Sequence, residues 1–163
     1  MSHAPITLLQ QREIEAKIVG PIFRAFAQEV GEPRAREILV GAIRDLARNA
    51  GSAAATACGG NDLQQLSSTI ENWRAGQALT LDILHRDDQS LEFNVTRCQF
   101  AEMYRRLGLE ELGPILSCDR DAAMIEGFNP EIEFQRTQTI MEGAAHCDFR
   151  YHFEKLGESR TVT

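Results

Sequence analysis

The sequence contains no apolar run of the roughly 20 residues that a membrane-spanning helix requires. Its N-terminus, MSHAPITLLQQREIEAK, also lacks the basic segment and following apolar stretch of a secretory signal peptide. Clusters of Lys and Arg are missing, and the net charge is −7, which argues against a nucleic-acid surface. We therefore expect a cytoplasmic chain that has neither a membrane nor a nucleic-acid partner.

Several chemical signatures are absent as well. The chain has no P-loop, no GxGxxG dinucleotide fingerprint and no GxSxG nucleophile elbow, so nucleotide-binding and α/β-hydrolase functions have no support. Its four cysteines form no CxxC pair, and their spacings match no standard zinc signature. In a cytoplasmic chain such cysteines are expected to be thiols, nucleophiles or metal ligands rather than disulfides. Cys58 lies outside any pattern and is expected to be a small filler.

The composition is that of an ordinary globular protein, with 43% hydrophobic and 25% charged residues in a chain of 163. This length predicts one domain, residues 1–163, with a core that needs no disulfide bonds. Within it we expect a helical part over residues 1–76 and a sheet part that carries the site over 77–155. The polar tail, 156–163, is expected to be frayed.

Three helices are predicted in the first half. Apolar residues at helical spacing, interrupted at Gly20-Pro21, predict either a kinked helix or two abutting helices between Ile6 and Val30. A second helix is expected from about Arg34 to Asn49, with Gly51 as its C-cap. A third is expected from residue 61 or 62 to 76. The small residues of segment 51–60 fit a connector that moves over the site or a close-packed helical turn, and we favour the connector. The first helix is defined by Ile14, Ile18, Ile22, Phe26 and Val30.

The second half changes to alternating patterns. Leu79–Ile83 and Leu91–Val95 predict a β-hairpin, and two helices follow, from Cys98 and from residue 110 or 114 to a Gly127 cap. Two further strands are expected over 132–140 and 147–153. The fold class is therefore α+β, with N-terminal helices on an antiparallel sheet of about four strands and two helices inserted between the strand pairs.

Cys118 and Asp121 lie three apart on a predicted helix and so share one face, toward the core. A buried carboxylate needs a partner, and Arg136, in phase with Phe134 on a predicted strand, needs an anion. Asp121 could be that anion, or the carboxylate of a ligand could be. The alternatives are a structural ion pair and an edge-strand Arg136 that reaches solvent.

Cys147 shares strand phase with Phe149 and is expected to point inward, whereas His146 points the other way. If Cys98 and Cys118 converge on Cys147, these three thiols and Asp121 could form a tetrahedral metal site. Zinc is therefore an open alternative, although no cofactor is assigned.

The segment from Val95 to Phe153 contains a series of short pieces in a fixed order: Thr96-Arg97-Cys98, Leu107-Gly108, Leu116-Ser117-Cys118-Asp119-Arg120-Asp121, Gly127-Phe128-Asn129-Pro130, Arg136-Thr137-Gln138-Thr139, Gly143 and Cys147-Asp148-Phe149. In these pieces the segment resembles the L-2-amino-thiazoline-4-carboxylic acid hydrolase family. The closing piece, from Gly143 to Phe149, is also faintly similar to small-molecule-binding domains of the vinyl-reductase and haem nitric-oxide-binding type, some of which hold zinc through cysteines.

The resemblance implies a hydrolase that opens a small carboxylated heterocycle of the cyclic isothiourea type, giving an N-carbamoyl cysteine from aminothiazoline carboxylate. In this interpretation Cys118 is the nucleophile, Asp121 holds the amidinium group and relays a proton, and Arg136 binds the ligand carboxylate. The alternative function is a non-catalytic small-molecule-binding or sensor domain with structural or zinc-bound cysteines. A homo-oligomer is expected from base rates. The supporting candidates are Cys98 and Cys147 at the site, His146 as a reserve acid or base, and Thr137 and Thr139 as hydrogen-bond donors to the substrate.

Overall fold

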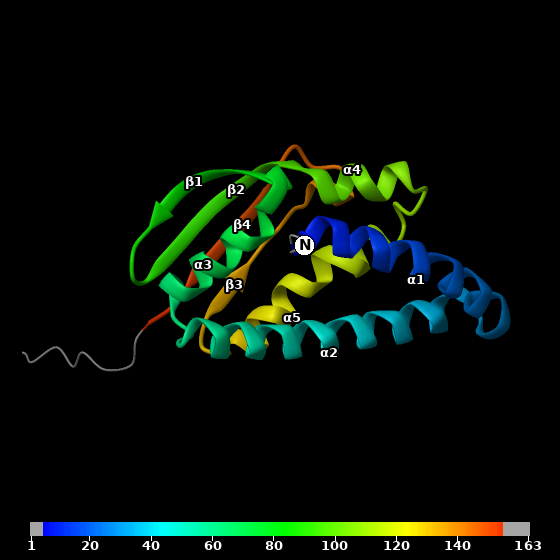
Figure 1. The fold of residues 1–163 in the computed structure, drawn as a ribbon, viewed down its shortest axis with the longest axis horizontal. Coiled ribbons are helices and arrows are strands. Elements are labelled where there is room, and N and C mark those ends of the chain that lie inside the picture. The colour runs from blue at the N-terminus through cyan, green and yellow to red at the C-terminus, as the bar shows by residue number, and fades with distance from the viewer. Residues whose placement is uncertain (1–4, 155–163) are drawn as a thin grey trace, which may run out of the picture.

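The computed structural model describes residues 5–154, so the predicted frayed tail lies outside the described residues. Its N-terminal half is helical, as the periodicity predicts (Figure 1). Thr7 caps the first helix through a capping box with Gln10, and Asp62 caps the third in the same way with Gln65. None of the helices in the described part of the chain combines the length and apolarity needed to span a bilayer. The elements of this half are α1 (Leu8–Val30), α2 (Glu32–Cys58), α3 (Leu63–Trp73) and the 3₁₀ turn η1 (Ala75–Gln77).

The second half supplies a four-stranded antiparallel sheet of order β1-β2-β4-β3, which confirms the predicted α+β class. The predicted hairpin is present, and Asp87 accepts hydrogen bonds from the backbone N–H groups of Gln89 and Ser90 in its turn. Helices α4, η2 and α5 are inserted between β2 and β3, as expected. The elements are β1 (Leu79–Arg86), β2 (Ser90–Cys98), α4 (Gln99–Arg106), the π-helical turn η2 (Pro114–Cys118), α5 (Asp119–Phe128), β3 (Glu133–Gln135), the 3₁₀ turn η3 (Ile140–Glu142) and β4 (Cys147–His152).

Alternate residues of the two central strands form the core face of the sheet. Phe93 of β2 stacks on Phe149 of β4 with ring centroids 4.9 Å apart, and both are buried. Helices α3 and α5 contribute Leu66 and Ile125 to the same cluster. Burying these apolar side chains, at about 1.5–3 kcal/mol each, holds the helices against the sheet. The predicted inward phase of Cys147 and Phe149 is thereby confirmed.

The prediction of a connector over residues 51–60 was wrong, because α2 continues to Cys58. Gly51 is buried inside this helix and does not cap it. A Cβ at Gly51 would overlap the carbonyl oxygen of Met124 in α5. The same is true from the side of α5. A Cβ at Gly127, which was expected to end α5, would overlap the carbonyl oxygen of Arg48 in α2. The small residues therefore allow two helix backbones to touch, and this contact fixes α2 as a helix.

Helix α1 is a single helix with Pro21 inside it, so the alternative of two abutting helices was wrong. Its buried residues are Ala16, Gly20 and Phe23. Ala16 and Phe23 belong to a second hydrophobic cluster, which also contains Tyr104 and Leu112. The stripe of apolar residues that predicted the helix lies on a different face and is exposed. The α1–α2 hairpin extends beyond the sheet (Figure 1).

The predicted strand over 132–140 is much shorter, since β3 covers only Glu133–Gln135. The side chain of Asp148 ends the strand pairing. Its Oδ1 atom accepts the backbone N–H groups of Thr137 and Gln138, at 2.9 Å each, in place of a strand partner. The chain then leaves the sheet and enters η3, which carries Met141 over the site described next.

Candidate functional site

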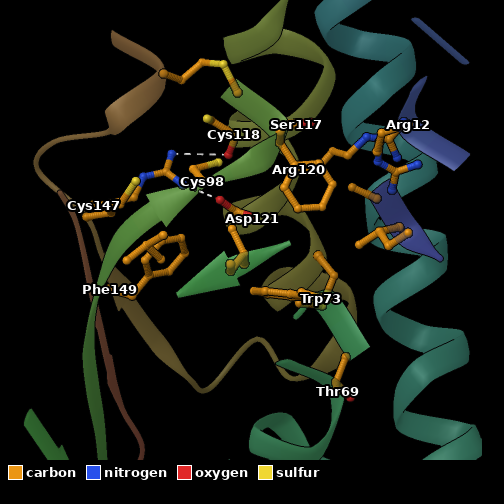
Figure 2. Close-up of a pocket in the computed structure, with 18 of the residues that line it drawn as sticks. Arg12, Thr69, Trp73, Cys98, Ser117, Cys118, Arg120, Asp121, Cys147 and Phe149 are labelled. Carbon is orange, nitrogen blue, oxygen red and sulfur yellow. Dashed lines mark hydrogen bonds and ion pairs between the residues drawn. The ribbon is translucent and has the colours of Figure 1, made fainter. Parts of the chain in front are cut away.

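A cavity of about 210 Å³ lies between the helical layer and the sheet. Figure 2 shows how its labelled residues are distributed. Three cysteines lie at one side, Arg12 and Arg120 lie at the other, and Asp121 lies between them. Trp73 and Phe149 provide aromatic surface. The cavity therefore combines two separate polar ends with an apolar wall, an arrangement common in small-molecule sites.

The sequence left open whether Cys98, Cys118 and Cys147 converge, and in the structure all three line the cavity. Cys98 ends β2, Cys118 ends the π turn and Cys147 begins β4. Burial raises the pKa of Cys98 to about 11 and also raises the pKa of Cys147. Burial, and then the nearby Asp121 carboxylate, raises the pKa of Cys118 well above its usual range. All three are therefore protonated thiols at neutral pH and weak nucleophiles.

The same cysteines do not fit a metal centre. Within residues 5–154, no group of three or more His, Cys, Asp or Glu side chains has the arrangement of a metal site. The sulfur of Cys147 instead accepts the backbone N–H of Ile140 at 3.2 Å. We therefore derive no chemistry through zinc.

Asp121 and Arg136 form an ion pair on the cavity wall, with side chains that are 20% and 14% exposed. Arg136 Nη1 donates to Asp121 Oδ2, and Nη2 donates to the carbonyl oxygen of Cys118 at 3.2 Å. Asp121 is thus the anion that Arg136 required. Burial raises the pKa of Asp121 to about 6, and the Arg136 guanidinium opposes this rise. Asp121 can therefore exchange a proton near neutral pH.

A second charged cluster faces the cavity from the helical side. Glu15 Oε2 accepts from Arg12 at 2.7 Å and from Arg120 at 3.3 Å, so one carboxylate is shared by two guanidinium groups. Both arginine side chains are nearly buried, at 12% and 13% exposed. Burial lowers the pKa of Arg120, and the neighbouring Arg12 lowers it further. The cluster carries one excess positive charge, which an additional anion would stabilise.

The π turn explains how one short segment binds both Arg120 and Arg136 through its backbone carbonyl groups. A π turn bonds each N–H five residues back, and here it leads directly into the α-helical bonding of α5. At this junction the carbonyl of Leu116 accepts Arg120 Nε at 2.7 Å, and the carbonyl of Cys118 accepts Arg136. Ser117, between them, forms a hydrogen bond with the buried Tyr104 hydroxyl at 2.9 Å.

Three predicted residues do not line the cavity. Thr137 donates to Asp148 Oδ2 at 2.6 Å. Thr139 is buried and caps η3, where it donates to Glu142 at 2.8 Å. His146 precedes β4 outside the cavity, and its carbonyl accepts from Gln138. The first two side chains hold the loop that positions Arg136, and we leave all three out of the proposed chemistry.

Sequence reasoning missed Arg12, Arg120 and Trp73. The signal for Arg120 was available, because it continues the helical stripe of Leu116 and Ala123, which are both buried. A cation on a buried apolar stripe requires a nearby anion, just as the buried Asp121 carboxylate requires a cation. Arg12 had no such signal, because its neighbours on α1 gave no indication of which face is buried.

Comparison with solved structures supports the fold. The phenol-responsive sensory domain of the transcription activator PoxR, solved with phenol, matches with a TM-score of 0.52 at 12% sequence identity. The alignment covers 86% of this chain and 75% of that chain. At this identity the likeness concerns the fold alone. Comparison with curated proteins gave no match.

The family comparison covers most of the sequence. The model of the L-2-amino-thiazoline-4-carboxylic acid hydrolase family matches residues 11–151, a range that includes Arg12 and every other cavity residue named above. The chain belongs to the L-2-amino-thiazoline-4-carboxylic acid hydrolase family.

Proposed function

We propose that this protein hydrolyses a small carboxylated heterocycle of the cyclic isothiourea or amidine type, such as L-2-amino-thiazoline-4-carboxylate. The observation that carries the proposal is the distribution of charge in the cavity, with a cationic pair at one side and Asp121 between that pair and the cysteines. A ring with a carboxylate at one end and an amidine at the other is complementary to this distribution. The family name supports hydrolysis as the reaction class.

In this proposal the ligand carboxylate binds to Arg12 and Arg120. Each guanidinium has five N–H groups, and among the described residues Arg12 donates one hydrogen bond and Arg120 two. Donors therefore remain for a ligand. Arg136, the first candidate for this role, already donates to Asp121 and Cys118. Its role becomes the orientation of the Asp121 carboxylate.

Asp121 then serves as the base. The ring binds as its amidinium form, in which both nitrogens are already protonated. Asp121 accepts one proton from water while the water oxygen bonds to the amidine carbon of the ring. The carbon–sulfur bond then breaks, the proton held by Asp121 passes to the departing sulfur, and the new hydroxyl loses its proton to solvent as it becomes the carbonyl, so the neutral product differs from the neutral substrate by one water. A pKa of about 6 suits both steps, because the carboxylate is mostly ionised at neutral pH and can still release its proton to a thiolate.

Covalent attack by Cys118 is the second route. It has less support, because burial and Asp121 both disfavour the Cys118 thiolate. Intact-protein mass spectrometry during turnover distinguishes the two routes. A Cys118→Ala variant that keeps its activity and shows no adduct supports attack by water, whereas an adduct on Cys118 supports the covalent route.

The proposal is tested by incubating the purified protein with L-2-amino-thiazoline-4-carboxylate and following the product by mass. We expect a gain of one water and a new free thiol. If neither appears at high protein concentration, this substrate is wrong. A panel of related carboxylated cyclic amidines then tests the reaction class, and failure on all of them contradicts the hydrolase proposal.

Replacing Arg120 with methionine should raise KM about 10- to 100-fold and change kcat much less, because a charge-assisted hydrogen bond to the substrate is lost. The measurement compares the carboxylated substrate with 2-amino-2-thiazoline, which lacks the carboxylate. The effect on KM should be confined to the carboxylated compound. Arg106→Met is the matched control, because Arg106 pairs with Glu13 on the surface. An equal loss with both compounds would indicate structural damage instead.

A sensor function is the second candidate, and the phenol-bound PoxR sensory domain is the observation that favours it. Trp73 is the only tryptophan in the sequence and lines the cavity, so its fluorescence reports directly on ligand binding. Saturable quenching by the carboxylated cyclic amidines, without any product, would favour the sensor. Quenching followed by product formation favours the enzyme.

A further inference from the structure

Ser117 is a cavity residue whose hydroxyl has no part in the chemistry proposed above. It lies in the π turn η2, three positions before Arg120, and both residues line the cavity. In Figure 2, Ser117 lies on the same side of Asp121 as Arg120 and Arg12. Its Oγ atom forms a hydrogen bond of 2.9 Å with the hydroxyl of Tyr104. Which of these two hydroxyls donates determines what Ser117 offers to a ligand.

The burial of Tyr104 determines the direction of this hydrogen bond. Tyr104 is 0% exposed, and within residues 5–154 its hydroxyl has Ser117 as its one hydrogen-bond partner. If Ser117 donated, the Tyr104 proton would be buried without an acceptor, which carries the full desolvation cost of a polar group. Tyr104 therefore donates and Ser117 accepts. The proton of the Ser117 hydroxyl then has no acceptor in the described part of the chain, and it is available to a molecule in the cavity.

Packing holds Tyr104 in the position that this hydrogen bond requires. Tyr104 comes from α4 and belongs to the second hydrophobic cluster together with Leu112 and Leu116. A Cβ at Gly113, the residue before η2, would lie only 3.2 Å from Cδ2 of Tyr104, so the missing side chain lets the ring lie against the start of the turn. A fixed Tyr104 keeps the Ser117 hydroxyl ordered before a ligand binds, which lowers the entropy cost of binding.

The surroundings of Ser117 favour an anionic acceptor. Burial raises the pKa of Tyr104, whereas the hydrogen bond to Ser117 and the nearby Arg12 and Arg120 guanidinium groups oppose this rise. The two hydroxyls therefore lie in the field of the cluster that Arg12, Arg120 and Glu15 form, with its one excess positive charge. A carboxylate has two oxygens with about four lone-pair sites, so it can accept from Ser117 and from both arginines together.

We propose that Ser117 donates a third hydrogen bond to the ligand carboxylate, beside Arg12 and Arg120, and that Tyr104 is the positioning residue that fixes Ser117 as a donor. This role rests on the proposed function in one respect, because both require a carboxylate at this end of the cavity. It also narrows the substrate class to compounds whose acid group is ionised. A protonated or amidated acid would place a donor where three donors already lie.

The affinity of the ligand, read from Trp73 fluorescence, tests the role of Ser117. The probe is L-2-amino-thiazoline-4-carboxylate, and 2-amino-2-thiazoline is its match without the acid group. Ser117→Ala should raise the Kd of the acid about 10-fold, as expected for a lost hydrogen bond to a charged group, and leave the Kd of the second compound unchanged. During turnover, KM should change in the same way and kcat much less.

Ser68→Ala is the matched control, because Ser68 donates to the Gln64 carbonyl at an exposed position of α3. It removes the same hydroxyl group from a helix outside the cavity. Both compounds should bind to this variant as they bind to the unmodified chain.

Tyr104→Phe tests the positioning role. It should raise the Kd of the acid roughly threefold, since the Ser117 donor is kept but is no longer held in one orientation. The double variant should match Ser117→Ala, because Tyr104 affects the ligand only through Ser117. The double variant also removes the unpaired Tyr104 hydroxyl that Ser117→Ala leaves buried, so it provides the same comparison if that single variant fails to fold.

Four results separate the role of Ser117 from the hydrolase activity. If the acid binds without product and Ser117→Ala weakens its binding, the hydrolase proposal fails and the role of Ser117 stands. If the acid is hydrolysed and Ser117→Ala leaves its KM unchanged, the role of Ser117 is wrong. An equal loss with both compounds, or single-variant effects that add in the double variant, would mean a structural hydrogen bond only and would also overturn it. A chain that binds no carboxylated cyclic amidine would overturn both.

Discussion

Replacing Asp121 with asparagine is expected to lower kcat about 10²- to 10⁴-fold, the range typical of a lost general acid–base group. Asparagine keeps the shape of the side chain and can accept the hydrogen bond from Arg136, but it cannot take a proton from water. Because the substrate still binds through Arg12 and Arg120, KM should change by much less. The measurement is steady-state turnover of a confirmed substrate together with Trp73 fluorescence for binding.

Asp119→Asn is the control for this change. Asp119 lies on the same helix, pairs with Arg44 at 3.6 Å and does not line the cavity. Its turnover should stay close to that of the unmodified chain. Full activity in Asp121→Asn would exclude Asp121 as the base and would favour the covalent route through a cysteine thiol.

The pH dependence follows from the raised pKa of Asp121, about 6. A base acts in its ionised form, so kcat/KM should fall about tenfold per pH unit below the pKa and level off above it. The residual activity of Asp121→Asn should lose this dependence. A rate that instead rises only above pH 8 would indicate a thiolate.

Gly127→Ala is expected to give the largest loss of stability. The added methyl group overlaps the carbonyl oxygen of Arg48, which belongs to the backbone of α2 and cannot move as a side chain does. Separating the two helices should lower the free energy of unfolding by about 3 kcal/mol or more. In a domain of this size that corresponds to a fall in Tm of roughly 6–12 °C.

Gly41→Ala is the matched control, because Gly41 lies in the same helix α2 with no atom within 4 Å of an added Cβ. There alanine should raise the free energy of unfolding by about 0.5–1 kcal/mol, as expected for an exposed helix interior. Thermal and urea unfolding of both variants measure the difference. If both variants are stabilised, the close contact between α2 and α5 is wrong.

The sequence patterns identified most elements because their signals are local. Period-two alternation predicted the β1–β2 hairpin, and Asp62 marked the start of α3. The errors have long-range causes. Gly51 looked like a helix end because nothing local shows that α5 packs against it, and the strand after Ile132 ended early because Asp148 captured its N–H groups.

The sequence predicted only the part of the site whose signals are local. Strand and helix phase placed Cys118, Asp121 and Cys147 inward, and the need of Arg136 for an anion pointed to Asp121. Arg12 could not be found this way, since α1 has two apolar faces and its sequence does not tell which one meets the cavity. Only the tertiary ion pair between Glu15 of α1 and Arg120 of α5 brings Arg12 beside Arg120.

The π turn over Pro114–Cys118 has a consequence for comparing this chain with its relatives. Such a turn holds one residue more than α-helical bonding would, so deleting one residue there would rotate the preceding chain by about 100° relative to α5. Ser117 and Cys118 would then face a different direction while Arg120 and Asp121 kept theirs. A single-residue gap at this point of an alignment would therefore divide relatives into two groups whose cavities present different chemistry, even where every motif letter agrees.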